Sequence, residues 1–463
     1  MIFSSVTFLF LFLPPVLLLY YIVPVKLKNF ILLAASLIFY AWGEPIYVIL
    51  MLYSILLNYS MGLLMDRVPK MKTEILVFTV FVNLLLLGFF KYYGFLMENV
   101  NAIFHLNLPI RRLALPIGIS FYTFQALSYI IDLYRGKFPV QKNIVRFATY
   151  ITMFPQLIAG PIVRYEDVER QLEKRTLSLP RFGKGAVRFI IGLAKKVLLA
   201  NLTGAVFEQI AAQAGSVSTL GAWIGALAYT FQIYFDFSGY SDMAISLGDM
   251  LGFRFSENFN SPYAAESVTD FWRRWHISLG TWFREYVYIP LGGNRVSVIK
   301  HIRNILVVWM LTGLWHGASW NFVIWGLYYG ILLLLEKYVF LKWKIPTFIR
   351  RIFTLLFVIV GWVIFSAESL PQILTTLQAM FGFAPKGFAD STALYVLKSS
   401  WILLAAAAFF SLPILKKPLA AFKKSHANAL YYTCAALLLV IVFTVSVAFL
   451  VTENYNPFLY FRF

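Results

Sequence analysis

Residues 75–96 decide the fold class, and the stretch reads ILVFTVFVNLLLLGFFKYYGFL. It contains a single charged side chain, Lys91. An α-helix rises about 1.5 Å per residue, so roughly 20 apolar residues cross the hydrocarbon layer of a bilayer. The stretch therefore predicts a transmembrane helix.

The composition extends this prediction to the whole chain of 463 residues. Hydrophobic residues make up 60% and charged residues 13%, against roughly half and a quarter in soluble domains. Aromatic residues reach 18%, which is typical of proteins with interfacial aromatic belts. A soluble multidomain protein is excluded. Cys434 is the one cysteine, so no intrachain disulfide can form.

Similar apolar runs recur along the sequence and predict an all-α, polytopic integral membrane bundle. The longer runs lie at about 5–23, 45–65, 75–96, 113–133, 186–212, 221–237, 319–340, 349–367, 391–413 and 428–451. With the marginal runs 29–41 and 303–316, we expect about 11–12 transmembrane helices, the first of them retained rather than cleaved. No internal repeat or composition break marks a second domain, so residues 1–463 are expected to form a single integral membrane domain.

The net charge of +19 comes from 40 Lys and Arg against 21 Asp and Glu. These cations are scattered over short loops, which indicates positive-inside orientation and anionic head groups as partners, and no nucleic acid. We expect a multi-pass protein of the cell (inner) membrane with both termini outside. The loops expected inside are 26–28, 66–74, 135–146, 295–303, 337–351 and 416–424, whereas the pair Arg111-Arg112 falls outside as an exception.

Two stretches depart from plain spans. In residues 154–161, FPQLIAGP, Pro and Gly open the backbone and predict a re-entrant hairpin, with a kinked ordinary helix as the alternative. Residues 269–288 predict one helix lying in the cytoplasmic interface, begun by Asp270 and ended by Pro290. Its aromatic face carries, at helical spacing, Phe271, Trp275, Ser278, Trp282 and Tyr286.

Among the five histidines, His316 has the most unusual surroundings, the sequence GLWHGASW at 313–320. It lies about 20 Å of helix beyond Arg303, part-way across a layer roughly 30 Å thick. A titratable group at that depth marks a cavity or a path by default, although a histidine hydrogen-bonded between helices is the alternative. The remaining histidines outside the 269–288 helix are interpreted as structural: His105, His301 and His426.

Asp236 and Asp242 end an apolar run, and we expect them to terminate a helix and to pair with arginines rather than bind a metal. The sequence has no Gly-x-Ser-x-Gly elbow, Walker loop, dinucleotide fingerprint or zinc spacing, so no metal or bound cofactor is expected. Two imidazoles, His276 and His316, without a nucleophilic Ser or Cys partner favour proton abstraction from a substrate hydroxyl.

These motifs carry a family resemblance. WRRWHISL at 272–279 and LWHG at 314–317 resemble the membrane-bound O-acyltransferase (MBOAT) superfamily. LPIGISF at 115–121, the segment 156–164 and NPFLYFRF at 456–463 narrow the resemblance to the bacterial alginate O-acetyltransferase branch, over essentially the whole chain.

The resemblance implies funnels from both faces that meet at His316, with a cytoplasmic acyl thioester entering from inside and the acceptor from outside. It also implies O-acetylation of an exopolysaccharide or cell-wall polymer, with an extracytoplasmic partner of the serine-hydrolase-like acetyltransferase type. His316 is the expected general base. His276 is expected to position the donor or to stabilise the developing oxyanion.

The donor is expected to be acetyl-CoA or an acylated carrier protein. Arg284, Asn294 and Arg295 would line its mouth because they join the 269–288 helix to the span of His316; pairing of the arginines with Asp236 or Glu285 is the structural alternative. Two other functions stay open: D-alanyl transfer to teichoic acid from a carrier protein, and a proton-coupled transporter with His316 as relay.

Overall fold

The computed structural model describes residues 1–111, 113–213, 216–340, 343, 345–415, 418, 428–452 and 458–459. Within this part of the chain the secondary structure is helical, and the one β pairing is an isolated antiparallel bridge between Phe259 and Trp275. The predicted all-α class is confirmed. The chain forms two compact units, Met1–Phe189 with Ser241–Ser256, and Ile190–Tyr240 with Glu257–Phe463.

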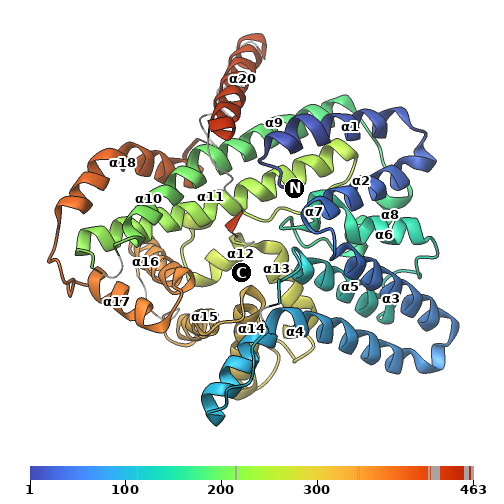
Figure 1. The fold of residues 1–463 in the computed structure, drawn as a ribbon, viewed down its shortest axis with the longest axis horizontal. Coiled ribbons are helices and arrows are strands. Elements are labelled where there is room, and N and C mark those ends of the chain that lie inside the picture. The colour runs from blue at the N-terminus through green and yellow to red at the C-terminus, as the bar shows by residue number, and fades with distance from the viewer. Residues whose placement is uncertain are drawn as a thin grey trace. The chain divides into compact units, whose positions relative to one another are not determined.

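The first unit holds the helices up to α9 (Figure 1). Their bounds are α1 Leu13–Ile22, α2 Lys28–Gly43, α3 Val48–Arg67, α4 Lys72–Phe104, α5 Ile119–Tyr134, α6 Ile144–Thr152, α7 Phe154–Leu157, α8 Tyr165–Glu173 and α9 Leu179–Ala194, whose end belongs to the second unit. Between α3 and α4, Asn58 and Asn83 exchange side-chain amide hydrogen bonds of 3.1 and 3.0 Å. Such reciprocal pairs join apolar helices that have no water to satisfy them.

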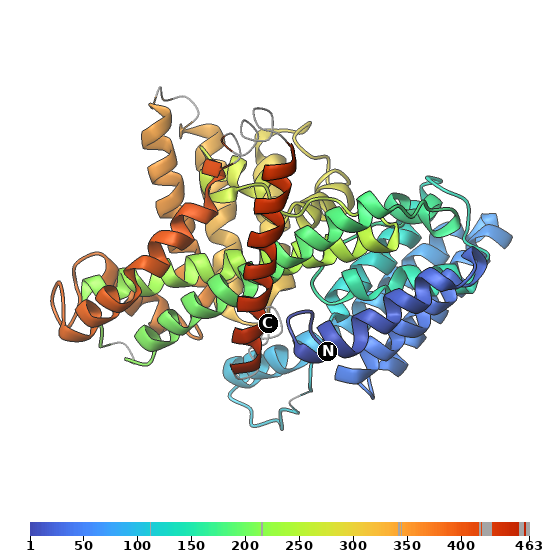
Figure 2. The same ribbon diagram turned by 90° about the horizontal axis from the view of Figure 1, so that it is seen from above.

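The second unit holds the helices from α10 onward, with the end of α11 belonging to the first unit. Their bounds are α10 Leu202–Ala211, α11 Thr219–Leu251, α12 Val268–Arg274, α13 Ile277–Phe283, α14 Val298–His316, α15 Trp320–Tyr338, α16 Thr347–Ser366, α17 Leu370–Met380, α18 Ser391–Ser411 and α20 Asn428–Thr452. Two π-helical turns, Lys195–Asn201 and Arg284–Tyr288, extend α9 and α13. Helices α14 and α15 pack side by side (Figure 2).

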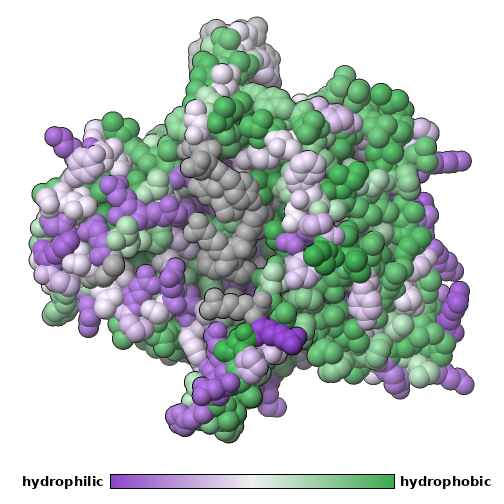
Figure 3. All heavy atoms as spheres, in the orientation of Figure 1, coloured by the Kyte–Doolittle hydropathy of each residue, from purple (hydrophilic) through white to green (hydrophobic). Residues whose placement is uncertain are grey.

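Seven helical stretches in the described residues are long and apolar enough to cross a membrane: Val25–Gly43, Val48–Arg67, Pro69–Phe104, Leu179–Ala211, Thr347–Ser366, Ser391–Ser411 and Tyr432–Thr452. The other predicted spans are helical as well, but they are shorter or carry more polar side chains. Large apolar side chains lie on the surface of the first unit (Figure 3). On α4, for example, Phe78 and Phe81 are 53% and 60% exposed.

The break predicted at 154–161 is present. Helices α6 and α7 have nine and four residues, which correspond to roughly 14 and 6 Å. Neither helix is long enough to cross the bilayer, so the alternative of one kinked membrane-spanning helix does not apply. Pro155 lies in the first turn of α7. At Gly160 a Cβ would lie 2.6 Å from the Cα of Gln156, so the turn that follows α7 requires glycine.

The prediction of a single helix over residues 269–288 is wrong. Its backbone breaks at His276, whose φ of 45° and ψ of 53° are left-handed. The aromatic face points into the protein rather than into lipid, since Trp275 is 2% exposed and its ring centroid lies 4.7 Å from that of Trp362, with the rings tilted. Ser267, not Asp270, caps α12, by accepting the Asp270 N–H at 3.1 Å.

The expectation that Asp236 and Asp242 terminate a helix is also wrong, because both lie within α11. In the second unit, Lys196 lies 2.6 Å from Asp236; in the first, Arg188 lies 2.7 Å from Asp242. Each carboxylate is bonded to a cation. It therefore does not draw hydrogen bonds away from the backbone of the helix, which continues past both aspartates. Asp242 has the expected arginine partner, whereas Asp236 has a lysine.

Several predicted features lie outside the described residues. They are Arg112, His426, Lys416, Lys417, Lys423 and Lys424 of the inner loop, and residues 456–463 apart from Phe458 and Leu459.

Candidate active site

His316 is the last residue of α14 and is 4% exposed. Glycines let α14 and α15 approach closely here. A Cβ at Gly313 would collide with the carbonyl oxygen of Phe322, and one at Gly326 with that of Trp309. Gly313 and Gly326 therefore allow the two helix backbones to approach each other closely.

Aromatic rings surround the His316 imidazole. Its ring centroid lies 5.1 Å from Trp315, 5.0 Å from Trp325 and 5.2 Å from Phe365, all in edge-on arrangements. Large, rigid rings of this kind create an environment of low polarity. Such an environment disfavours the charged form of a titratable group.

His276 lies between α12 and α13 and is 2% exposed. Its ring stands edge-on to Phe237, with centroids 4.6 Å apart, and lies 5.9 Å from the ring of Trp315. Trp315 thus contacts both imidazoles. The two histidines singled out by their motifs, 40 residues apart in the sequence, meet at one indole.

The backbone on both sides of His276 is held by the segment that precedes α12. Phe259 and Trp275 form the antiparallel bridge, and the N–H of Asn260 donates to the carbonyl of Arg274 at 2.9 Å. On the other side of His276, the N–H of Ile277 donates to the carbonyl of Asn258 at 3.0 Å. The left-handed conformation of His276 is therefore fixed by neighbours rather than by its own preference.

The Asn258 side chain also contacts the imidazole. Its Oδ1 lies 3.1 Å from His276 Nδ1, 2.9 Å from Ser278 Oγ and 3.2 Å from the Ser278 backbone N. Burial lowers the pKa of His276 to about 3. The ring is therefore neutral at physiological pH.

Glu336 anchors the start of α12. Its buried carboxylate accepts the N–H groups of Val268 at 2.7 Å and Thr269 at 3.2 Å. A carboxylate at this end also complements the helix dipole. A cavity of about 220 Å³ lies beside Glu336, and its lining includes Glu336, Leu332 and Phe357. Neither His276 nor His316 lines this cavity.

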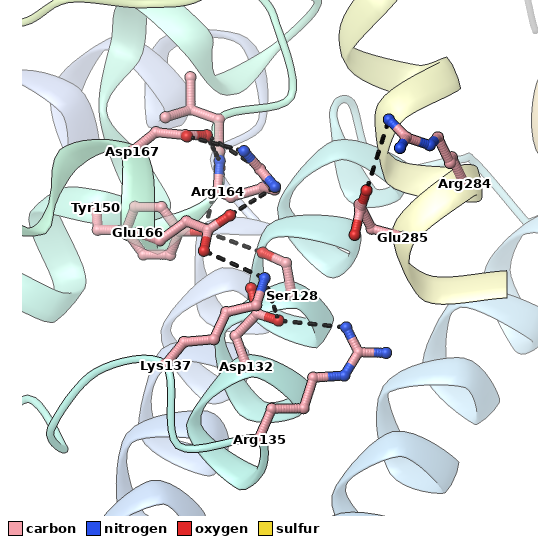
Figure 4. A network of polar contacts seen from close by, with 11 residues as sticks. Ser128, Asp132, Arg135, Lys137, Tyr150, Arg164, Glu166, Asp167, Arg284 and Glu285 are labelled. Carbon is pink, nitrogen blue, oxygen red and sulfur yellow. Dashed lines mark hydrogen bonds and ion pairs between the residues drawn. The ribbon is translucent and has the colours of Figure 1, made fainter. Parts of the chain in front are cut away.

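The predicted donor residues lie on the surface. Arg284 is in the π-helical turn after α13, and its exposed guanidinium lies 3.8 Å from Glu285 (Figure 4). Asn294 and Arg295 are exposed in the connection to α14. Arg284 therefore pairs with Glu285, as the structural alternative expected. Asp236, the other carboxylate named there, pairs with Lys196. The structure brings the two histidines together but gives no contact between them and these three residues among those described.

Sequence reasoning missed Asn258, Phe237 and Glu336. Asn258 belongs to the polar stretch SENFNSP at 256–262, whose only signal was a turn-like composition.

Among the described residues, no group of three or more His, Cys, Asp or Glu side chains is arranged to hold a metal ion.

Comparison with known proteins gives the family. The model of the MBOAT, membrane-bound O-acyltransferase family matches residues 137–375, which include both histidines. The probable alginate O-acetylase AlgI of Azotobacter vinelandii is 41% identical over 500 residues, covering 100% of both chains. The peptidoglycan O-acetyltransferase of Helicobacter pylori is 36% identical over 82% of this chain and 80% of its own. The teichoic acid D-alanyltransferase of Bacillus subtilis is 28% identical over 56% and 71%.

These relatives confirm the branch to which the motifs point, since the alginate O-acetylases match the chain throughout. The helical fold and the seven long apolar helices agree with a multi-pass membrane protein. The chain therefore belongs to the membrane-bound O-acyltransferase family and is an O-acyltransferase.

Proposed function

We propose that this protein passes an acetyl group from a cytoplasmic thioester donor through the cell (inner) membrane for O-acetylation of an extracellular polysaccharide or cell-wall polymer. His316 is the general base. The observation that carries the proposal is the convergence of His316 and His276 on Trp315 in a buried aromatic interior. The names of the alginate and peptidoglycan O-acetyltransferase relatives support the acetyl group and the polymer acceptor.

The chemistry requires a base because a hydroxyl is a poor nucleophile. The acceptor oxygen attacks the thioester carbonyl carbon while its proton passes to His316. The carbon–sulfur bond then breaks, and the sulfur leaves as a thiol with the proton that His316 returns. A positioned base contributes about 10²–10⁴-fold. The surrounding rings keep water from competing with the acceptor.

His276 assists the reaction. It either positions the donor or stabilises the oxyanion that forms at the thioester carbonyl. Its burial beside Trp315 supports a place at the reacting groups rather than in a surface helix.

The donor enters past Arg284, Asn294 and Arg295 on the cytoplasmic side. Their exposure leaves them accessible to a large anionic donor, acetyl-CoA or an acylated carrier protein. Exposed guanidinium groups attract phosphates and bind them with paired hydrogen bonds. On the outer side, a serine-hydrolase-like partner receives the acetyl group or presents the polysaccharide acceptor.

The test is acyl transfer by the purified, detergent-solubilised chain. Radiolabelled acetyl-CoA is offered with an oligosaccharide acceptor, and a D-alanyl carrier protein is offered in a parallel reaction. We expect label on the acceptor from acetyl-CoA. Transfer of D-alanine alone would favour the teichoic acid reaction. Proton uptake into liposomes without any acyl transfer would contradict the proposal in favour of a transporter.

A further inference from the structure

The orientation of the Asn258 side-chain amide is determined by a backbone group. The peptide N–H of Ser278 donates to Asn258 Oδ1 at 3.2 Å, and a peptide N–H is a donor only. The amide nitrogen cannot take this place, because two donors would then face each other. The Ser278 hydroxyl, 2.9 Å from the same oxygen, agrees with this orientation.

The position of this oxygen determines where His276 carries its hydrogen. His276 Nδ1 lies 3.1 Å from Asn258 Oδ1, and a carbonyl oxygen only accepts hydrogen bonds. Nδ1 must therefore carry a hydrogen. A neutral imidazole has one ring N–H, so the lone pair belongs to Nε2.

The same asparagine also fixes the backbone around the ring. Its main-chain carbonyl accepts the N–H of Ile277, and its side chain is bonded to Ser278, so it holds the two residues that follow His276. Asn258 is fully buried, at 0% exposure. A left-handed conformation is unfavourable for a residue with a Cβ, such as His276, and it persists where neighbours over-determine it.

We infer that Asn258 is a positioning residue that locks His276 in the Nδ1–H tautomer, which makes Nε2 a hydrogen-bond acceptor toward the substrate. The inference rests on the proposed function and decides between the two roles of His276. Stabilising an oxyanion requires an N–H donor, which a neutral ring in this tautomer does not offer at Nε2. His276 instead accepts a hydrogen bond from an N–H or O–H group of the substrates and so orients them.

The tautomer can be observed directly. The full-length chain, labelled with ¹⁵N-histidine and solubilised in detergent near neutral pH, is measured by NMR, and His276→Gln identifies the signals among the five histidines. We expect a protonated Nδ1 and an unprotonated Nε2 for His276. A protonated Nε2 in the unmodified protein would overturn the inference, whether or not the protein transfers acyl groups.

Three variants then separate positioning from folding. Ser278→Ala keeps the peptide N–H and the acceptor oxygen and is the matched control, so the tautomer and the transfer rate should persist within a few-fold. Asn258→Asp also keeps an acceptor oxygen, so Nδ1 should stay protonated. Its carboxylate favours the charged ring, so Nε2 should gain a hydrogen and the transfer rate should fall. Asn258→Leu removes the acceptor, and kcat should fall roughly 10- to 100-fold, as when the partner that orients a histidine is lost, with the single tautomer lost as well.

An Asn258→Leu protein that keeps the Nδ1–H tautomer and full transfer would contradict the inference. If this variant does not fold, the spectra of the unmodified protein and of Ser278→Ala decide alone: the Nδ1–H tautomer in both supports the inference, and its loss in either contradicts it. Absence of transfer from every donor by the unmodified protein would reject the proposed function while leaving the tautomer assignment standing.

Discussion

The Asp132 cluster of the first unit and the histidine site of the second unit bury ionisable side chains in different ways. In the first unit, the Asp132 carboxylate is 1% exposed and lies 3.1 Å from Lys137 and 3.5 Å from Arg135. Lys137 also reaches Glu166 at 3.2 Å (Figure 4). In this cluster the buried carboxylate lies beside two cations.

At the histidine site of the second unit, aromatic rings lie against both imidazoles, and the uncharged Asn258 amide lies 3.1 Å from His276 Nδ1. Burial keeps the pKa of His276 far below that of an exposed histidine. The contrast indicates that paired charges maintain the fold of the first unit. The neutral His276 imidazole in its apolar surroundings, by contrast, remains able to accept a hydrogen bond.

The largest effect on stability is expected from Asp132→Ala. The change removes the buried acceptor of Lys137 and Arg135, whose side chains are 29% and 32% exposed. Unfolding should become easier by about 2–3 kcal/mol, the usual contribution of hydrogen bonds to charged groups. Glu173→Ala is the control, because Glu173 is 69% exposed in its pair with Arg146, and exposed pairs contribute about 0–1 kcal/mol. Thermal unfolding in detergent measures both. Equal melting shifts would show that the buried Asp132 carboxylate contributes no more to the first unit than the exposed Glu173 does.

A smaller effect is expected from Gly326→Ala, which tests how the second unit holds His316. The added methyl would meet the carbonyl of Trp309, and overpacking of this kind costs about 1–3 kcal/mol. Gly88→Ala in α4 is the control, since nothing lies within 4 Å of its Cβ; this change should be neutral or slightly stabilising. A stable Gly326→Ala protein would show that the α14–α15 contact tolerates separation.

The pH dependence of unfolding should report the neutral state of His276. Its pKa is about 3 in the folded chain and about 6.5 when unfolded, so the unfolded state binds the additional proton. Stability therefore decreases as the pH falls below about 6.5, by up to about 1.4 kcal/mol per pH unit. His276→Gln should lack this component between pH 6 and 4, and identical curves for both proteins would disprove it.

The smallest effect is expected at the donor mouth. Arg284→Ala and Arg295→Ala should each raise the KM for acetyl-CoA roughly five-fold, which corresponds to about 1 kcal/mol, with melting temperatures unchanged. Lys398→Ala removes an exposed cation on α18 and is the control. An unchanged KM in both arginine variants would show that these residues do not contact the donor.

Sequence patterns predicted the helical class, which the structure confirms, because apolar length is a local signal. The motifs also singled out both histidines, whose catalytic roles stay predictions. The patterns misplaced the surroundings of His276, since a helical aromatic spacing is the same whether the stripe faces lipid or protein. They also missed Asn258, which lies 18 residues before His276 and meets it only through the fold. The ion pair of Asp236 depends likewise on Lys196, which lies in another helical segment.

The most direct test of the central claim compares two buried histidines of α14. His316 lies among aromatic rings, whereas His301 is bonded to Tyr338 at 3.0 Å and Lys337 at 3.2 Å. Acetyl transfer from labelled acetyl-CoA is measured for purified His316→Ala and His301→Gln, with thermal melting as the folding control. We predict that the His316 variant stays folded and loses about 10²–10⁴-fold in transfer rate, while the His301 variant keeps its rate per folded molecule. A folded His316→Ala protein with near-normal transfer would contradict the account.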